Sequence, residues 1–89
     1  PGAEAERAVA GATLVLAELD LREGEPAHAE RRMRDAAAIY KALDAKAELG
    51  DALMRLSRIA KKRGDLRAAE RYSSQAYAAT RPLSANVDM

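Results

Sequence analysis

The side chains best placed to do chemistry are a run of cations in the second half of the chain. Arg58, Lys61 and Lys62 recur at spacings of three and four, so they share one face of a helix, and Arg55 precedes them. Such a face can bind phosphates or carboxylates. No aromatic side chain that could stack on a base is interleaved with these cations, so an acidic protein partner is favoured over nucleic acid. A solvated face accounts for the pattern equally well.

Other chemically reactive residue types are sparse. His28 is the single histidine, and the chain has no Cys to form a disulfide or hold a metal ion. Arg63-Gly64-Asp65 spells an adhesion tripeptide, but a helix stop followed by a helix cap needs the same residues. No glycine-rich loop that could hold a phosphate is present. We therefore expect no enzymatic activity, no cofactor and no metal ion, and we interpret His28 as a solvated surface residue.

Helices must position these side chains, because apolar residues recur at spacings of three and four along most of the chain. Gly24 and Gly64 can adopt the left-handed conformation that ends a helix. Pro26 suits the first position of a helix, and Asp65 can cap another. We expect Arg81-Pro82 to end the last helix. The spacing predicts four helices, at about 4–23, 26–43, 45–63 and 66–80.

The start of the third helix is the least regular point of this pattern. We place a tight turn at Asp44, with Asp44 as the N-cap of a helix from Ala45 to Arg63. Gly50 then lies inside that helix, where glycine costs about 1 kcal/mol relative to alanine. Either the helix begins at Asp51, or another helix crosses closely at Gly50. Close crossing is favoured.

The first helix carries two apolar stripes. The first consists of Ala5, Ala8, Val9, Ala12, Val15 or Leu16, and Leu19. The second consists of Ala10, Leu14, Ala17 and Leu21. One hairpin partner covers only one face, so Leu14 and Leu21 are expected to be left uncovered and to contact another chain. The hypothesis follows that the protein pairs with itself, or with a neighbouring chain, through this helix.

Charge is distributed unevenly along the chain. Residues 1–45 contain six Lys and Arg against nine Asp and Glu, and residues 46–89 contain nine against five. The resulting net charges of −3 and +4 can steer a partner or favour head-to-tail association. Glu30 and Arg34 lie four apart and are interpreted as part of a solvated face. No apolar run approaches the roughly 20 residues that span a bilayer, so we expect a cytoplasmic protein without membrane contact.

The two halves of the chain repeat each other at a spacing of 40 residues. The matching pairs are Leu16 and Leu56, Leu19 and Ile59, Gly24 and Gly64, Glu25 and Asp65, Ala29 and Ala69, Glu30 and Glu70, Arg31 and Arg71, and Ala36 and Ala76. An internal repeat of this size with helical periodicity is typical of a solenoid of helical hairpins.

This repeat resembles the tetratricopeptide repeat (TPR) family over about residues 12–81. The resemblance rests on the leucine of the first helix, the turn glycine followed by an acid, and two alanines seven apart in the second helix. The 40-residue spacing looks like the variant found in the sensor arrays of large bacterial transcription regulators. The aromatic residues usual in the family's first helix are replaced by Thr13, Asp20, Leu53 and Ala60.

The resemblance implies an all-α fold in which antiparallel helical hairpins stack as a short right-handed solenoid. The domain would cover residues 1–81, with hairpins at about 4–43 and 45–80 and a flexible tail at 82–89. The chain begins Pro1-Gly2 rather than with Met, so its ends are not expected to be natural domain ends.

In this family, the first helix of each hairpin lines a groove that receives a peptide. The groove positions carried over are Leu14, Glu18, Leu21 and Arg22 from the first hairpin, and Met54, Arg58, Lys61 and Lys62 from the second. The resemblance thus implies a protein-interaction module of a bacterial regulator or scaffold, with an acidic protein or peptide as its expected partner. The alternative is a homodimer formed through the apolar stripe of the first helix, and a nucleic-acid binder is the least favoured.

Overall fold

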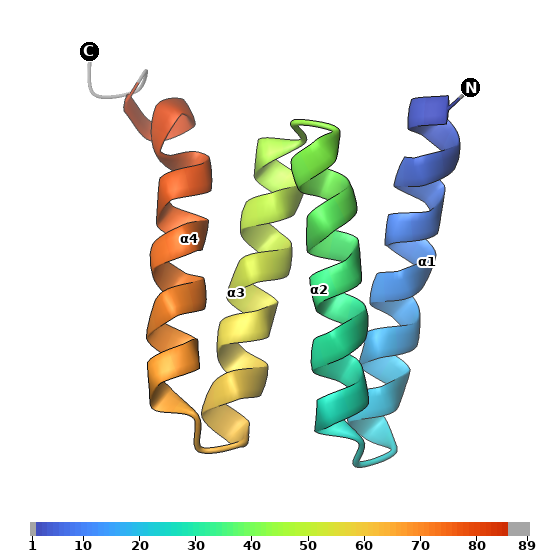
Figure 1. Cartoon of the computed structure of the whole chain (residues 1–89), viewed down its shortest axis with the longest axis vertical. Helices are drawn as coiled ribbons and strands as arrows, with labels where there is room; N and C mark the ends of the chain where they lie inside the picture. The colour runs from blue at the N-terminus through green and yellow to red at the C-terminus, as the bar shows by residue number, and fades with distance from the viewer. Residues whose placement is uncertain (1, 86–89) are drawn as a thin grey trace.

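A computed structural model describes residues 2–85 of the chain, with side chains as far as Arg81. Over this range, the chain forms four α-helices and no strand (Figure 1). The helices are α1 (Gly2–Arg22), α2 (Pro26–Ala42), α3 (Lys46–Lys62) and α4 (Leu66–Ala85). The all-α class expected from the periodicity is confirmed, and so is the number of helices.

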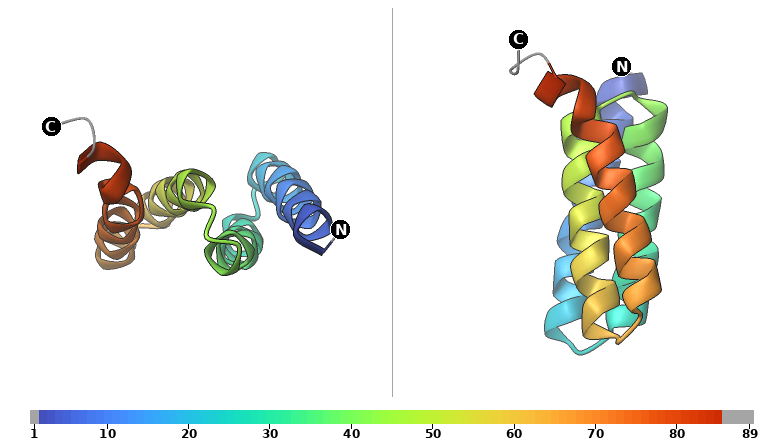
Figure 2. Two further views of the ribbon diagram at one scale, coloured as in Figure 1. Left: turned by 90° about the horizontal axis from the view of Figure 1, so that it is seen from above. Right: turned by 90° about the vertical axis from the view of Figure 1, so that its left-hand side faces the viewer.

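Each helix runs antiparallel to the one before it and packs against its neighbours in chain order (Figure 1). The result is a flat layer of 43 × 35 × 16 Å, with α1 and α4 at opposite edges. Viewed from above, α3 is displaced to one side of the line that joins α2 and α4 (Figure 2). This stagger leaves hollows between helices that are two apart in the chain.

Turns of one design join the helices, 20 residues apart. The residues at their left-handed position are Gly24 (φ 75°), Asp44 (φ 57°) and Gly64 (φ 80°). In each turn, the next residue donates its N–H to the carbonyl five residues back. These bonds are Glu25 to Asp20 at 2.8 Å, Ala45 to Tyr40 at 2.9 Å and Asp65 to Ala60 at 2.9 Å. Each bond closes the end of a helix, so the 40-residue sequence repeat contains two structural units of one helix and one turn.

The prediction that Asp44 caps the third helix is wrong. Asp44 takes the left-handed position that glycine takes in the other two turns, which aspartate tolerates better than most residues. The N-cap of α3 is Ala45, and α3 begins at Lys46, which excludes a start at Asp51. The cap predicted at Asp65 is confirmed, because its Oδ1 accepts the backbone N–H of Ala68 at 3.0 Å.

A close approach of α4 to α3 explains the glycine inside α3. A Cβ atom added to Gly50 would lie 2.5 Å from Cγ2 of Thr80, well inside the roughly 3.5–4.0 Å at which carbon atoms pack. The close-crossing explanation is therefore confirmed. Ser57, two turns further along α3, also meets α4 closely, since its hydroxyl donates to the Ala69 carbonyl at 2.8 Å.

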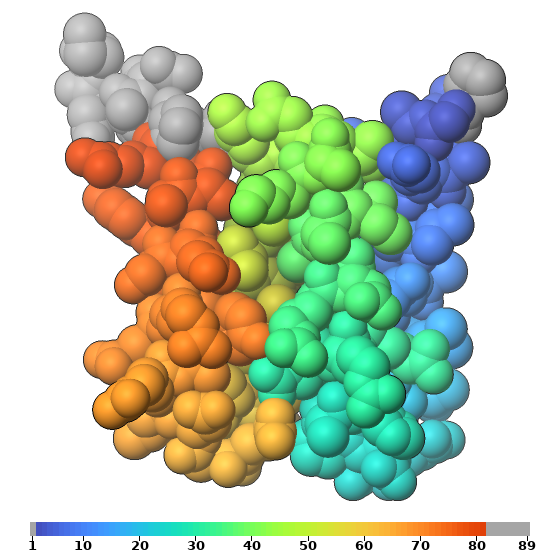
Figure 3. All heavy atoms as spheres, in the orientation of Figure 1, coloured from blue at the N-terminus to red at the C-terminus, as the bar shows by residue number. Residues whose placement is uncertain are grey.

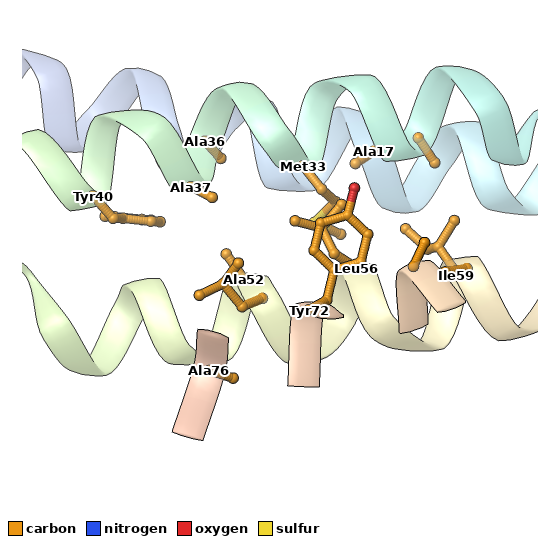
Figure 4. Close-up of a cluster of buried hydrophobic side chains, with 14 of the residues drawn as sticks. Ala17, Met33, Ala36, Ala37, Tyr40, Ala52, Leu56, Ile59, Tyr72 and Ala76 are labelled. Carbon is orange, nitrogen blue, oxygen red and sulfur yellow. The ribbon is translucent and has the colours of Figure 1, made fainter. Parts of the chain in front are cut away.

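Small side chains line most of the core. Met33, Leu56 and Ile59 are its largest fully buried apolar side chains, and the ring of Tyr72 packs beside Met33 and Leu56 (Figure 4). The buried alanines are Ala10, Ala17, Ala29, Ala36, Ala37, Ala45, Ala52, Ala60, Ala68, Ala69 and Ala76. Close helix approach, rather than bulky side chains, fills this core.

The two apolar stripes of α1 face opposite to the prediction. Ala10 and Ala17 are fully buried, and Leu14 and Leu21 pack against the core. The stripe that remains exposed contains Val9, Val15, Leu16 and Leu19, which we call the outer stripe of α1. The expectation that Leu14 and Leu21 stay uncovered is wrong. Alanines allow α1 to approach α2 closely, as Gly50 and Ser57 allow α3 to approach α4.

The predicted end of the last helix at Arg81-Pro82 is also wrong, because α4 continues to Ala85. A proline near a helix end removes one backbone hydrogen bond and bends the helix rather than stopping it. The last turns of α4 lean away from the axis of the earlier turns (Figure 2). The expected tail at 82–89 is therefore helical as far as Ala85, and residues 86–89 lie outside the described residues.

Candidate functional site

Four of the eight predicted groove residues line one pocket between α1 and α3. This pocket has a volume of about 210 Å³ and its floor includes Met33 of α2. We call it the α1/α3 groove. The residues that line it are Glu18, Leu21, Met33, Arg55, Arg58, Ile59 and Lys62. The structure thus brings together Glu18, Leu21, Arg58 and Lys62, which are far apart in the sequence.

The other four predicted residues do not line this pocket. Arg22, Met54 and Lys61 are exposed on the surface outside it. Leu14 is partly buried, because it packs against the core on the covered side of α1. The carried-over positions therefore coincide with the pocket only in the C-terminal halves of α1 and α3.

Arg55 connects the two walls of the α1/α3 groove. Its Nη1 donates to Oε1 of Glu18 at 3.0 Å, and its Nε donates to Oδ2 of Asp51 at 3.0 Å. Glu18 is thus already engaged by a cation. Arg58 and Lys62, by contrast, form no ion pair with any residue in the described range. The groove therefore presents unneutralised positive charge beside an apolar floor.

A second and larger hollow lies between α2 and α4, on the side of the layer away from the α1/α3 groove. Its volume is about 640 Å³, and α3 forms its floor. Figure 3 shows this face, with α3 recessed between α2 and α4. We call it the α2/α4 groove. The residues that line it are Arg34, Ala37, Ala38, Lys41, Leu49, Leu53, Leu56, Arg71, Tyr72, Gln75, Ala78 and Ala79.

Sequence reasoning missed the α2/α4 groove. The resemblance directed attention to the first helix of each hairpin, whereas α2 and α4 are the second helices. A signal was present in the second helices, where Ala37 and Ala38, like Ala78 and Ala79, place small side chains next to cations. Small residues leave space between helices only if a third helix holds the two apart, and the sequence does not show that arrangement.

A buried polar cluster stands behind the α2/α4 groove. Glu30 is only 8% exposed, so its interpretation as part of a solvated face is wrong. Its Oε2 accepts a hydrogen bond from the Tyr72 hydroxyl at 3.0 Å, and its Oε1 pairs with Arg63. Burial raises the pKa of Tyr72, and the hydrogen bond to Glu30 and its negative charge act in the same direction, opposed by Arg34 and Arg71.

The remaining chemistry of the described residues is limited. Within residues 2–85, no group of three or more His, Asp or Glu side chains is placed to hold a metal ion. None of the helices in that range is both long and apolar enough to cross a membrane. His28 is exposed in the first turns of α2.

Comparisons of the chain with protein-family models, with curated proteins and with solved structures find no match. The functional assignment below therefore rests on the two grooves, their charges and the exposed surface of α1.

Proposed function

We propose that this chain is a protein-interaction module that binds an acidic polypeptide segment in the α1/α3 groove. The observation that carries the proposal is the pairing of two cations, Arg58 and Lys62, with an apolar floor in one pocket. Neither cation has an ion-pair partner in the described part of the chain. A carboxylate entering the groove would gain charge-assisted hydrogen bonds there.

The apolar floor adds a second requirement to the partner. Leu21, Met33 and Ile59 lie between the cations and the opposite wall of the groove. A segment that combines an acidic side chain with a neighbouring aliphatic one satisfies both features, because the flexible thioether of methionine adapts to different apolar shapes. The Arg55 to Glu18 ion pair at 3.0 Å spans the two walls and fixes their separation.

The resemblance to tetratricopeptide repeats supports the same assignment. Under this proposal, the two hairpins form a short right-handed solenoid of that type, and the α1/α3 groove is its concave, peptide-binding side. The 20-residue spacing of the turns and the consecutive antiparallel packing are consistent with such a solenoid. The module would then belong to a bacterial regulator or scaffold and would catalyse no reaction.

Selection from a random peptide display library tests this function. We expect acidic peptides with aliphatic residues to be enriched, and the double variant Arg58→Glu/Lys62→Glu to bind them about tenfold more weakly. The matched control is Lys46→Glu/Arg67→Glu, which makes the same charge change at exposed positions outside both grooves. Enrichment of neutral or basic peptides, or equal binding by the two double variants, would contradict the proposal.

Self-association is a second candidate, because one observation favours it specifically. Leu16 and Leu19 of the outer stripe are 43% and 45% exposed, whereas Leu56 and Ile59, their counterparts 40 residues on, are 1% and 2% exposed. The counterparts lie in α3, which has a helix packed on each side, whereas α1 at the edge of the layer has only α2. A second copy of α1 would cover the outer stripe and recover part of the apolar burial.

Sedimentation equilibrium separates this candidate from the first. If the outer stripe pairs two copies, the wild type is a dimer at about 50 μM and Leu16→Glu/Leu19→Glu is a monomer. Tyr77→Glu serves as the control, since Tyr77 is an exposed apolar residue on α4 at the opposite edge. A monomeric wild type at that concentration rules the candidate out.

A further inference from the structure

We propose that the α2/α4 groove is a second docking surface, which takes a short amphipathic helix of another protein whose apolar anchors are flanked by carboxylates. This surface lies on the face of the layer away from the α1/α3 groove and uses different helices. The inference therefore goes beyond the function proposed above and does not depend on it.

The floor and walls of the groove call for apolar anchors. Leu49 and Leu53 of α3 contribute aliphatic side chains to the floor. The walls contain Ala38 of α2 and Ala78 of α4, whose small side chains are exposed and leave the floor open. The hollow of about 640 Å³ falls in the range of typical ligand pockets, which extends over roughly 300–1,000 Å³. Aliphatic side chains entering it would remove apolar surface from water.

The direction and length of the groove favour a helix as the occupant. α2 and α4 run in the same direction, and both pack against α3 (Figure 1). A helix laid over α3 between them would contact three helices at once, as a helix of a four-helix bundle does. The lining of α4 extends from Arg71 to Ala79, which is about 12 Å or two helical turns. Two turns present anchors at positions i, i+3 or i+4, and i+7.

Charge at the rim specifies the flanks of that helix. The lining includes Arg34, Lys41 and Arg71 and not a single carboxylate. Within the described residues, none of these three cations forms an ion pair. Arg71 lies over the ring of Tyr72 at 5.7 Å from its centroid, so it is held at the wall of the groove. Charge complementarity thus favours an acidic helix and repels a basic one.

The probe for the test is a fluorescein-labelled synthetic peptide of about 14 residues, with leucines at i, i+3, i+4 and i+7 and glutamates on both flanks of that stripe. One control peptide carries lysines in place of the glutamates, and another carries serines in place of the leucines. Fluorescence anisotropy measures binding to the wild type and to the double variant Lys41→Glu/Arg71→Glu. The matched protein control is Arg58→Glu/Lys62→Glu, which makes the same charge change in the α1/α3 groove.

We expect the acidic peptide to bind the wild type, and both control peptides to bind at least about tenfold more weakly. Lys41→Glu/Arg71→Glu should weaken binding by about tenfold, and Arg58→Glu/Lys62→Glu by less than about threefold. The single variant Ala38→Glu, which fills the groove with a charge, should also lose binding, whereas Ala47→Glu outside the groove should not. Circular dichroism confirms that each variant retains its helices.

Several outcomes would overturn the inference. These are no binding of the acidic peptide to the wild type, equal loss in the two double variants, or equally tight binding of the serine peptide. A wild type that is dimeric and becomes monomeric only in Lys41→Glu/Arg71→Glu would also overturn it, because a second copy would then occupy the groove. Loss of peptide selection by Arg58→Glu/Lys62→Glu bears on the α1/α3 groove alone, so the two proposals fail separately.

Discussion

The hydroxyl of Tyr72 donates a hydrogen bond of 3.0 Å to Glu30, and this bond joins α4 to α2 across α3. Arg63, at the end of α3, pairs with the other oxygen of the same carboxylate. A charge buried between helices is costly unless it is paired and hydrogen-bonded, and Glu30 is both. The cluster therefore ties three helices together at the point where the alanine-rich core offers few large side chains.

Removing the Tyr72 hydroxyl tests the weight of this cluster. Tyr72→Phe leaves Oε2 of Glu30 without its buried donor, so we expect the free energy of unfolding at neutral pH to fall by about 1–2 kcal/mol. Tyr77→Phe removes the same atom from a tyrosine that is 67% exposed, and should change stability by less than about 0.5 kcal/mol. Urea unfolding followed by circular dichroism measures both. Similar effects of the two substitutions would show that the buried hydrogen bond contributes little.

The raised pKa of Tyr72 predicts a loss of stability in alkali. The folded state holds the phenolic proton more tightly than the unfolded chain, chiefly because burial disfavours the phenolate. The resulting stability is fully present below the ordinary tyrosine pKa of about 10 and is lost as pH rises through the folded pKa. The stability difference between wild type and Tyr72→Phe should therefore shrink above about pH 10. A constant difference from neutral pH to high alkalinity would contradict this linkage.

The crossing of α3 and α4 at Gly50 predicts an unusual response to alanine. Gly50→Ala should lower the free energy of unfolding by about 1–3 kcal/mol, although alanine is the better helix former, because its Cβ meets the Thr80 methyl group. That methyl group cannot turn away freely, since Thr80 Oγ1 bonds to the Ala76 carbonyl at 3.0 Å.

Two further variants test the cause of that loss. Thr80→Ser removes the obstructing methyl group, so Gly50→Ala/Thr80→Ser should recover most of the lost stability. Gly11→Ala is the control, because a Cβ there meets nothing within 4 Å, and it should stabilise α1 by up to about 1 kcal/mol. Thermal unfolding of the four proteins would disprove the steric explanation if the serine variant restored nothing.

The three turns predict substitutions of opposite sign. Asp44 pays a conformational cost at φ 57°, so Asp44→Gly should raise the free energy of unfolding by up to about 1 kcal/mol. Its contact with Lys46 at 3.8 Å is exposed, and its loss should matter little. Gly64→Ala, at φ 80°, should lower stability by about 1–2 kcal/mol. A destabilising Asp44→Gly in urea unfolding would mean that the aspartate side chain stabilises the turn in some other way.

The repeat offers a matched pair of leucines with different surroundings. Leu56→Ala should cost about 2–5 kcal/mol, because it empties a fully packed position in α3. Leu16→Ala, at the equivalent place in α1, should cost less than about 1 kcal/mol in a monomer. Measuring both at two protein concentrations adds information. A cost for Leu16→Ala that grows with concentration would indicate that the outer stripe is covered by a second copy.

Local chemistry explains what the sequence predicted correctly. Helix periodicity, the stops at Gly24 and Gly64 and the cap at Asp65 depend on residues within one or two turns of each other, so the four helices and their antiparallel order could be predicted. Gly50 is also in this class, since a glycine inside a helix indicates close packing. Asp44 was misread because aspartate suits both a cap and a left-handed turn position, and its neighbours do not distinguish the two.

The tertiary structure alone decided which surfaces are buried and where the hollows lie. Both stripes of α1 are apolar, and only the approach of α2 selects the one with Ala10 and Ala17, because small side chains allow the closer contact. Glu30 has the sequence neighbours of a surface residue, yet it meets Arg63 and Tyr72 from distant segments. The α2/α4 groove likewise exists because α3 holds two helices apart. Burial and charge pairing depend on such long-range contacts, whereas helix formation depends on near neighbours.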